Sequence, residues 1–297
     1  MIRRFIVLAL LVCFSVNAHS QEPFPCDDSF YQVFGDLGEL LSYDLRSNTF
    51  VVAPNNAGRP LNAFGYRVED DFAYGLLQDN ANLARLGSDG TIVDLGTITS
   101  LPVNMYANAG FSNDGLLYVY SGGHAGDFNR FYAVNVDTVS VVETIDIAGP
   151  YFFTSDIAFN PIDGLFYGVS QFHPDAQVPP AMLLAIDVVA GTFEIIGPTN
   201  LSEDAVFGSM YADASGRVYG SDRIGLAIFY QFDIETGNAT ALGETVGVSP
   251  IDGFFCQTNP GPFPPRNVPT LSEWGLIAMA GILGIVGFMV MRRRALA

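Results

Sequence analysis

The sequence predicts an all-β protein, a five-bladed β-propeller, and three observations favour this class. An aromatic-rich strand pattern ending in Tyr recurs five times, at Tyr31, Tyr74, Tyr118, Tyr167 and Tyr219. The spacings of 43, 44, 49 and 52 residues suit a four-stranded propeller blade. The two ends of the repeat region carry complementary halves of one further blade. With 49% hydrophobic residues, the chain also has ample material for a packed core.

The first residues have the pattern of a secretory signal peptide, residues 1–20. Two arginines precede the apolar stretch 5–16, and the small residues of the segment 18–20 prepare a cleavage before Gln21. The alternative, a transmembrane anchor, is disfavoured because this apolar stretch is too short to span a bilayer. The sequence therefore predicts export through the secretion machinery.

The charge of the chain excludes one class of partner. The formal net charge is −18 at pH 7, and all 13 basic residues are arginines. Five of these arginines lie in the terminal segments, so the region between them is even more acidic. Because such a surface repels phosphate backbones and anionic lipid, we expect no binding to nucleic acid.

Each repeat holds the strands of one blade. After the repeated Tyr come a second strand pattern, a tight turn such as SDG or ETG, and a third strand pattern. Before four of the five Tyr strands lies another short strand, joined by turns such as SNDG and NPIDG. We expect the turn acids Asp114, Asp163 and Asp213 to stabilise these turns. A β-sandwich would also have many short strands, but it does not account for the repeated Tyr unit.

The first unit lacks its leading strand, and the segment 249–256 supplies one at the far end. Pairing this segment with the strand at 28–33 closes a ring of five blades, while six blades are the alternative if the first segment hides another strand. In this register Cys26 and Cys256 lie close together. Since the chain is bound for an oxidising compartment, we expect them to form a disulfide that closes the propeller, residues 26–256.

The candidate ligand face comes from the two longest loops. The segments 121–130 and 171–181 follow the Tyr strands of blades three and four, and they contain both histidines of the exported chain. Such loops emerge on the same face of a propeller as the loops that link successive blades. The candidate ligand residues on this face are His124, Asp127, Arg130, His173 and Asp175.

Catalytic motifs are absent from the sequence. It has no GxSxG elbow, phosphate-binding glycine loop, HExxH or CxxC pattern. We expect no catalytic residues, no metal ligands and no cofactor, with a structural calcium ion as the alternative. Asp156 and Asp252 are predicted on inner strands and could serve a hydrolase of the glycosidase or lactonase type. They fall one residue apart in the repeat alignment, so we expect them to point to opposite faces.

The last residues read as a linker and a membrane segment. Residues 257–267 are rich in proline and should separate the propeller from the C-terminal segment. Residues 275–291 are uncharged and just long enough for a transmembrane helix, with Trp274 at the interface. The basic tail Arg292, Arg293 and Arg294 should stay in the cytoplasm, which places the propeller outside.

The stretch VPTLSEWG at 268–275 resembles the IPTL-CTERM sorting signal of Gram-negative bacteria, whose pattern is I-P-T-L-x-x-W-G. Val268 replaces the leading Ile, and the matching positions are Pro269, Thr270, Leu271, Trp274 and Gly275. The resemblance covers residues 268–297 and implies recognition by an exosortase, a membrane cysteine transpeptidase that would cleave near the motif. An ordinary tail anchor is the alternative. The repeat region more loosely resembles propeller-like domains of bacterial secreted proteins.

These expectations favour an exported surface or extracellular-matrix protein. Its propeller would be a non-enzymatic binding or scaffold module for an extracellular carbohydrate or protein ligand. The precursor would sit in the inner membrane facing the periplasm, and the processed protein would reach the cell surface or the medium. The alternative is the secreted hydrolase that uses channel carboxylates.

Overall fold

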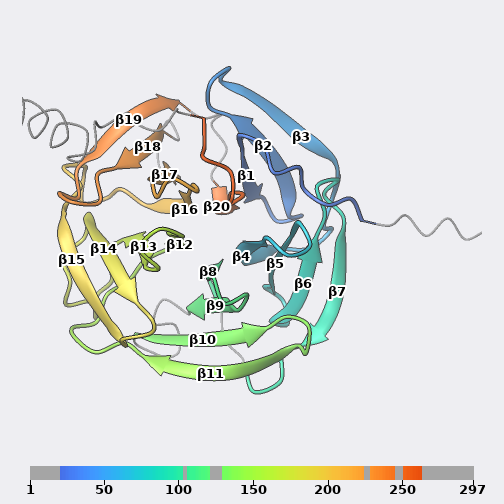
Figure 1. The fold of residues 1–297 in the computed structure, drawn as a ribbon, viewed down its shortest axis with the longest axis horizontal. Helices are drawn as coiled ribbons and strands as arrows, with labels where there is room; N and C mark the ends of the chain where they lie inside the picture. Colours follow the sequence, from blue (N-terminus) through green and yellow to red (C-terminus); the bar gives the residue numbers. More distant parts are fainter. Residues whose placement is uncertain (1–20, 103–105, 121–128, 224–227, 245–249, 263–297) are drawn as a thin grey trace, which may run out of the picture. The chain divides into compact units, whose positions relative to one another are not determined.

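The computed structural model describes residues 21–102, 106–120, 129–223, 228–244 and 250–262. Their strands form five antiparallel sheets of four strands each, arranged in a ring around a central axis (Figure 1). The prediction of a five-bladed propeller is therefore confirmed. The expected signal peptide, residues 1–20, and the expected transmembrane helix, residues 275–291, lie outside the described residues. Within the described ranges no helix is long and apolar enough to cross a membrane.

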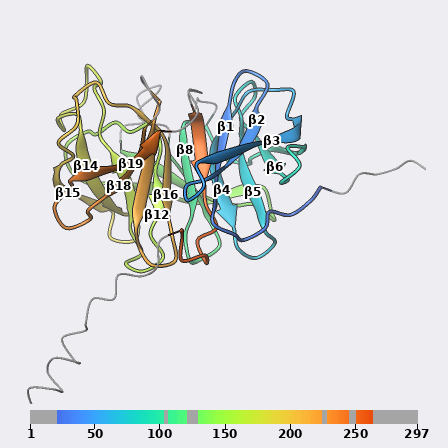
Figure 2. The same ribbon diagram turned by 90° about the horizontal axis from the view of Figure 1, so that it is seen from above.

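Each blade runs from an inner strand at the axis to an outer strand at the rim (Figures 1 and 2). From the inner to the outer strand, the blades are: blade 1, β20 (Pro250–Phe254), β1 (Ser29–Phe34), β2 (Glu39–Asp44), β3 (Thr49–Asn56); blade 2, β4 (Leu61–Arg67), β5 (Phe72–Leu77), β6 (Asn82–Leu86), β7 (Ile92–Thr97); blade 3, β8 (Asn108–Phe111), β9 (Leu117–Tyr120), β10 (Arg130–Asn135), β11 (Ser140–Asp146); blade 4, β12 (Ala158–Phe159), β13 (Phe166–Val169), β14 (Met182–Asp187), β15 (Thr192–Pro198); blade 5, β16 (Phe207–Ala212), β17 (Val218–Asp222), β18 (Ile228–Phe232), β19 (Ala239–Glu244).

The ring closes through blade 1, as predicted. Strand β20, from the end of the repeat region, pairs antiparallel with β1, and Phe254 lies opposite Tyr31. A disulfide joins Cys26 to Cys256 next to this pair, with a Cα–Cα distance of 5.3 Å. The disulfide prediction is therefore confirmed, and the covalent link holds together the two ends of the ring.

The repeated Tyr has a structural role in blades 2 to 5. Its hydroxyl donates a hydrogen bond to an aspartate in the turn that precedes its strand, and the other oxygen of that aspartate accepts a backbone N–H of the same turn. The pairs are Tyr74–Asp70 (2.6 Å), Tyr118–Asp114 (2.8 Å), Tyr167–Asp163 (2.8 Å) and Tyr219–Asp213 (2.9 Å). Burial, followed by the neighbouring aspartate, raises the pKa of each of these tyrosines, so they stay protonated and donate. The predicted role of the turn acids is confirmed.

Blade 5 meets blade 1 through a cluster of aromatic rings. Phe30 from β1 is fully buried, and its ring centroid lies 4.6 Å from that of Phe255 and 4.7 Å from that of Phe229. Tyr211 and Tyr219 of blade 5 contact the same ring edge-on. We call this blade 1–blade 5 contact the seam. It is the place where the first and last parts of the repeat region pack together.

Residues on both sides of the repeat region also pack on the propeller. Gln21, the expected first residue of the exported chain, donates its side-chain amide to the backbone carbonyls of Arg85 (2.9 Å) and Thr91 (2.8 Å) in blade 2. At the other end the propeller unit runs to Pro262, beyond the expected end at Cys256. There the backbone carbonyl of Asn259 accepts a hydrogen bond from the N–H of Ala214, at 2.8 Å.

Candidate functional site

A pocket lies where a segment that links blades 3 and 4 meets a loop of blade 4. The segment 170–181 follows β13, and the segment 147–157 links β11 to β12. A pocket of about 440 Å³ is lined by Asn129, Ile147, Gly149, Tyr151, Asp175 and Gln177. This volume falls in the range of small-molecule sites. Pockets of this kind are the default place to look for a ligand.

Backbone hydrogen bonds hold the two segments together. The N–H groups of Gln177 and Val178 both donate to the carbonyl of Tyr151, at 2.8 and 3.1 Å. The N–H of Tyr151 in turn donates to the side-chain oxygen of Gln177, at 3.3 Å. Because these bonds run in both directions between the segments, the pocket has a defined shape in the absence of ligand.

Asn129, which also lines the pocket, holds the segment 147–157 in place. Its backbone has a positive φ of 54°, a conformation that asparagine tolerates better than most residues. Its side-chain amide donates to the carbonyl of Pro150, at 3.0 Å, and its side-chain oxygen accepts the N–H of Phe152, at 3.2 Å. Both polar groups of Asn129 are therefore used to position the segment 147–157.

His173 lies beside the pocket and supports its wall. Its ring packs against Tyr151 and Phe153, with centroid distances of 5.5 and 5.0 Å. Its Nδ1 accepts a hydrogen bond from the backbone N–H of Asp175, at 3.2 Å, so in the neutral ring the proton sits on Nε2. The carboxylate of Asp175 is 68% exposed, and one oxygen lies 3.9 Å from that Nδ1. His173 thus orients the backbone that carries Asp175.

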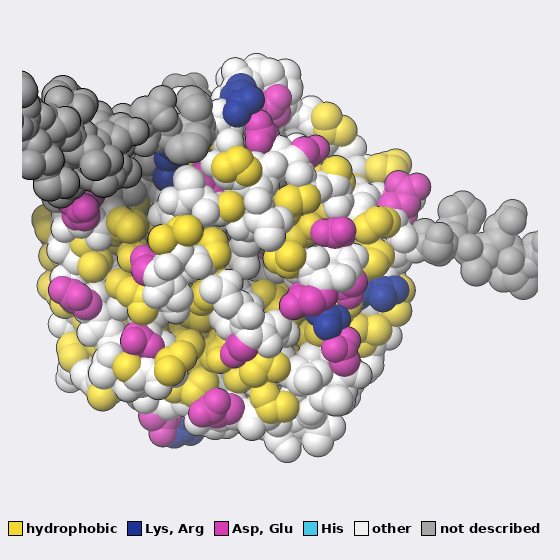
Figure 3. All heavy atoms as spheres, viewed as in Figure 1, with side chains coloured by type: hydrophobic (Ala, Val, Ile, Leu, Met, Phe, Trp, Pro, Cys, Tyr) yellow, Lys and Arg dark blue, Asp and Glu magenta, His cyan; other side chains and the backbone are white. Residues whose placement is uncertain are grey.

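The pocket is acidic and polar. Tyr151 is buried, and burial together with the charge of Asp175 raises its pKa to about 12, so the phenol stays neutral at physiological pH. Arg130 donates to Asp146 at 2.6 Å and is not among the residues that line the pocket. Over the face of the molecule in Figure 3, acidic side chains are scattered and basic ones are few.

The structure brings together part of the predicted ligand face. Asp175 lines the pocket and His173 adjoins it, whereas His124 and Asp127 lie outside the described residues. The sequence reasoning missed Tyr151 and Gln177. Their proximity arises from the path of two separate segments, and no motif marks it in the sequence.

The central channel corrects one expectation about Asp156 and Asp252. The strand registers place Phe254 opposite Tyr31 and Ala158 opposite Tyr167, so both aspartates stand two residues before the partner of the repeated Tyr. They occupy the same position in blades 1 and 4, and the expectation that they point to opposite faces was wrong. The corresponding positions of blades 2, 3 and 5 are held by Ala63, Asn108 and Ser209.

The residues at this position connect neighbouring blades. Asp252 of blade 1 accepts the N–H of Phe64 in blade 2, at 2.7 Å. Asn108 of blade 3 donates its amide to the carbonyl of Thr154 on the segment leading into blade 4, at 3.1 Å, and the hydroxyl of Thr154 donates back at 3.0 Å. Asp156 of blade 4 accepts the N–H of Met210 in blade 5, at 2.6 Å. These polar groups are used for assembly of the ring.

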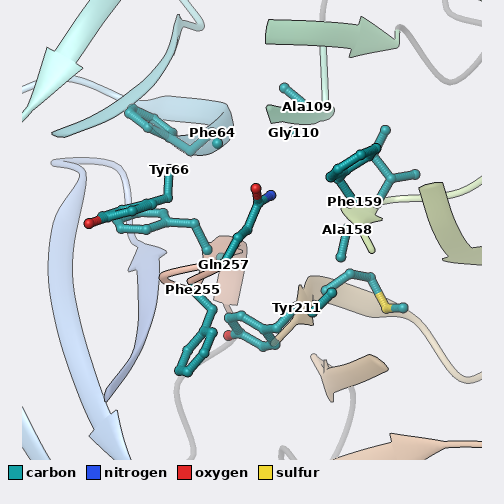
Figure 4. Close-up of a pocket in the computed structure, with 15 residues that line it drawn as sticks. Phe64, Tyr66, Ala109, Gly110, Ala158, Phe159, Tyr211, Phe255 and Gln257 are labelled. Carbon is teal, nitrogen blue, oxygen red and sulfur yellow. The ribbon is translucent and has the colours of Figure 1, made fainter. Parts of the chain in front are cut away.

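The side chain of Gln257 fills another part of the central channel. The side chain of Gln257 extends between the inner strands and donates to the carbonyl of Phe111, at 3.1 Å (Figure 4). The cavity that remains around it has a volume of about 20 Å³, room for about one water molecule. This cavity is too small for a substrate of ordinary size.

The described residues hold no group of three or more His, Cys, Asp or Glu side chains arranged to bind a metal ion.

Comparisons with known proteins identify two segments of the chain. Residues 33–259 match the family model described as "Repeat of unknown function (DUF6923)", and residues 268–294 match the IPTL-CTERM motif. The second match confirms the recognised sorting signal. None of the curated proteins compared with the chain matches it.

Several solved structures resemble the chain at low identity. A catalytically inactive virginiamycin B lyase from Staphylococcus aureus, with quinupristin, is 10% identical with a TM-score of 0.43, covering 75% of this chain and 72% of that one. An extracellular domain from Bacteroides thetaiotaomicron is 12% identical with a TM-score of 0.41, covering 73% of this chain and 26% of that one. A protein of unknown function from Bacteroides caccae is 13% identical with a TM-score of 0.41, covering 71% and 72%. These values carry no inference about activity.

Proposed function

Because this chain belongs to the family described as a repeat of unknown function (DUF6923), its role has to be inferred from its own site, and we propose that it is an exported, non-enzymatic binding propeller. The IPTL-CTERM sorting signal at residues 268–294 supports export. The observation that carries the binding role is the preformed pocket of about 440 Å³ between blades 3 and 4. Its walls are joined by backbone hydrogen bonds, so little ordering is needed when a ligand binds.

The chemistry of the pocket favours a neutral ligand rich in hydroxyl groups, such as an extracellular carbohydrate. The exposed Asp175 carboxylate and the Gln177 amide offer acceptors and a donor for hydroxyl groups. The acidic chain, which has no lysine, disfavours an anionic ligand.

The state of the channel carboxylates weighs against the hydrolase alternative. Asp156 is 1% exposed and Asp252 is 0% exposed, and both accept backbone hydrogen bonds from adjacent blades. A glycosidase needs its two carboxyl groups on either side of a bond in an accessible cleft. The inner strands would have to separate before a substrate could reach this pair.

Binding to the pocket is tested with a glycan array and the purified exported protein. We expect the wild type to bind neutral glycans without cleaving them, and we expect Asp175→Ala to bind about 10- to 100-fold more weakly. This range corresponds to the loss of one hydrogen bond to a charged group. Because the Asp175 side chain is exposed, the variant should fold as the wild type does.

The matched control is Glu235→Ala, which removes one exposed acid from the turn between β18 and β19. It should bind like the wild type. If Asp175→Ala and Glu235→Ala bind equally well, the ligand site is elsewhere. If the wild type binds no glycan, or releases cleaved products, the proposed binding role fails.

We further propose that the sorting signal is a substrate for an exosortase-type enzyme. In this scheme residues 275–291 hold the precursor in the inner membrane with the propeller on the periplasmic side. Arg292, Arg293 and Arg294 stay on the cytoplasmic side, in agreement with the positive-inside rule. Cleavage near Val268–Gly275 then releases the propeller to the cell surface or the medium.

Processing is tested by replacing Pro269 and Trp274 together with alanine. The double variant should accumulate at full mass in the membrane fraction, whereas the wild type should lose its C-terminal residues and leave that fraction. Mass spectrometry of the two fractions measures both outcomes. Asn267→Ala, just outside the motif, is the control and should be processed normally. A wild type that keeps its C-terminal residues and stays in the membrane fraction would show that the tail is an ordinary anchor. A double variant cleaved like the wild type would show that Pro269 and Trp274 are not needed for processing.

A further inference from the structure

Two acidic side chains come together in the interior near the axis. Asp156, on the segment before β12, and Asp252, in β20, occupy equivalent positions of blades 4 and 1 and are buried from solvent. The N–H of Gly253 donates to Asp252 at 2.6 Å and also interacts with Asp156. The two carboxyl groups therefore share a donor, and the charge of Asp252 acts on Asp156.

The groups that surround the pair are hydrogen-bond donors. Asp156 accepts the N–H groups of Ile157 (2.7 Å) and Met210 (2.6 Å), one at each oxygen. One oxygen of Asp252 accepts the N–H of Gly253, and the other accepts the N–H of Phe64. The N–H of Ala63 also interacts with this carboxyl group. A cation site would need oxygen ligands directed at the ion, whereas these backbone groups present N–H. Donors of this kind stabilise negative charge on a carboxylate.

Donors alone do not compensate for two negative charges in the interior. Among the described elements near the pair, β16 contributes Tyr211 and β4 contributes backbone groups. The neutral Gln32 of β1 interacts with Tyr211, and the neutral Asn108 of β8 binds Thr154, two residues before Asp156. No arginine or histidine among the described residues acts on the charge of either aspartate. Burial raises the pKa of both groups, and the charge of Asp252 raises that of Asp156 further.

We propose that Asp156 and Asp252 share one proton in the folded protein and form a pH-sensitive clasp that connects blades 4 and 5 and blades 1 and 2. With one proton present, the pair carries a single negative charge, and the oxygens still accept the backbone N–H groups. Loss of that proton leaves two adjacent buried negative charges. Repulsion between them then acts on the inner strands that the same carboxyls connect.

The direction of the pH dependence follows from which state of the protein, folded or unfolded, binds the proton more tightly. The folded pair keeps a proton that the unfolded chain releases at a pKa of about 4. Between that pH and the pH at which the folded pair loses its proton, the folded state holds more protons. Stability contributed by the pair is therefore greatest in acid and declines as pH rises. For one proton, the unfolding equilibrium constant rises up to tenfold per pH unit. This rise lowers Tm by roughly 2–5 °C per pH unit.

Unfolding of the wild type and of Asp156→Asn between pH 4 and pH 9 tests the clasp. Asparagine carries no charge but lacks one of the acceptor oxygens, so this variant is expected to be less stable at every pH. The informative quantity is the slope of stability against pH, which should be smaller in the variant. Glu235→Gln removes one exposed acid and is the matched control, with the slope of the wild type. This comparison separates the pair from the repulsion among the many surface acids.

An infrared spectrum of the wild type provides a second measurement in case the variant does not fold. At pH 7 the exposed carboxyls are ionised, so the shared proton should appear as a carboxylic acid band, shifted on deuteration. Parallel pH curves for the wild type and Asp156→Asn would overturn the proposal. So would the absence of the acid band at pH 7, or a metal ion bound at one equivalent per chain whose removal by a chelator lowers Tm in the wild type only.

Discussion

Replacing Cys26 and Cys256 together with serine is expected to lower the free energy of unfolding by up to about 5 kcal/mol. The bridge closes a loop with a sequence separation of 230, and the chain-entropy estimate for a loop of this size is about 5 kcal/mol. At roughly 2–4 °C per kcal/mol for a domain of this size, Tm should fall by roughly 10–20 °C. Thermal and urea unfolding of the two proteins measure the difference.

Reduction of the wild type is the natural control for the serine variant. Dithiothreitol should bring the wild type to the stability of the double serine variant and should leave the variant unchanged. A wild type that unfolds at the same urea concentration with and without the reductant would show that the bridge does not stabilise the ring. Mass spectrometry after thiol labelling establishes the redox state in each case.

Replacing Phe30 with alanine is expected to cost about 3–5 kcal/mol, the usual range for a large buried ring. Phe30 is fully buried at the seam, where it contacts Phe229 and Phe255 closely. Its loss leaves a cavity between blades 1 and 5 that the surrounding sheets cannot fill without moving apart. Urea unfolding measures the effect.

Phe172→Ala is the matched control for this substitution. The Phe172 side chain is 75% exposed, so its removal should change stability by less than about 0.5 kcal/mol. A Phe30→Ala variant as stable as Phe172→Ala would mean that the seam does not depend on the aromatic cluster. The aromatic cluster and the disulfide act independently if the losses of unfolding free energy from Phe30→Ala and from removal of the disulfide add when the two changes are combined.

The blade repeat could be predicted because each blade obeys local rules. The Tyr strand, the turn aspartate and the tight hairpins recur in sequence, and in blades 2 to 5 the Tyr hydroxyl binds that turn aspartate in the structure, as at Tyr167 and Asp163. The closure was also predictable, since DSFYQV lacks a preceding strand and SPIDGFFC lacks following ones. The cysteines gave an independent check, because a bridge requires their Cα atoms to lie within a few ångströms.

The register of the inner strands was not predictable in the same way. The pairing of β1 with β20 shifts between Val33 and Phe34, and the pairing of β4 with β5 shifts between Asn62 and Gly65. A shift of one residue moves a side chain to the other face of a strand. Asp252 itself lies in regular register, opposite Val33. Strand β20 has no turn that joins it to β1, so its alignment with the segment of Asp156 could not be counted along the chain, and an error of one residue placed the two aspartates on opposite faces.

The sequence by itself determined the repeat of strands, the pairing of the chain ends, the disulfide between Cys26 and Cys256, and the sorting signal at 268–294. Each depends on short-range patterns or on a motif of fixed spacing. Only the tertiary structure decided that Tyr151 and Gln177 form one pocket wall and that Asp156 and Asp252 meet in the interior. These contacts depend on how separate segments and blades pack around the axis, which no local pattern specifies.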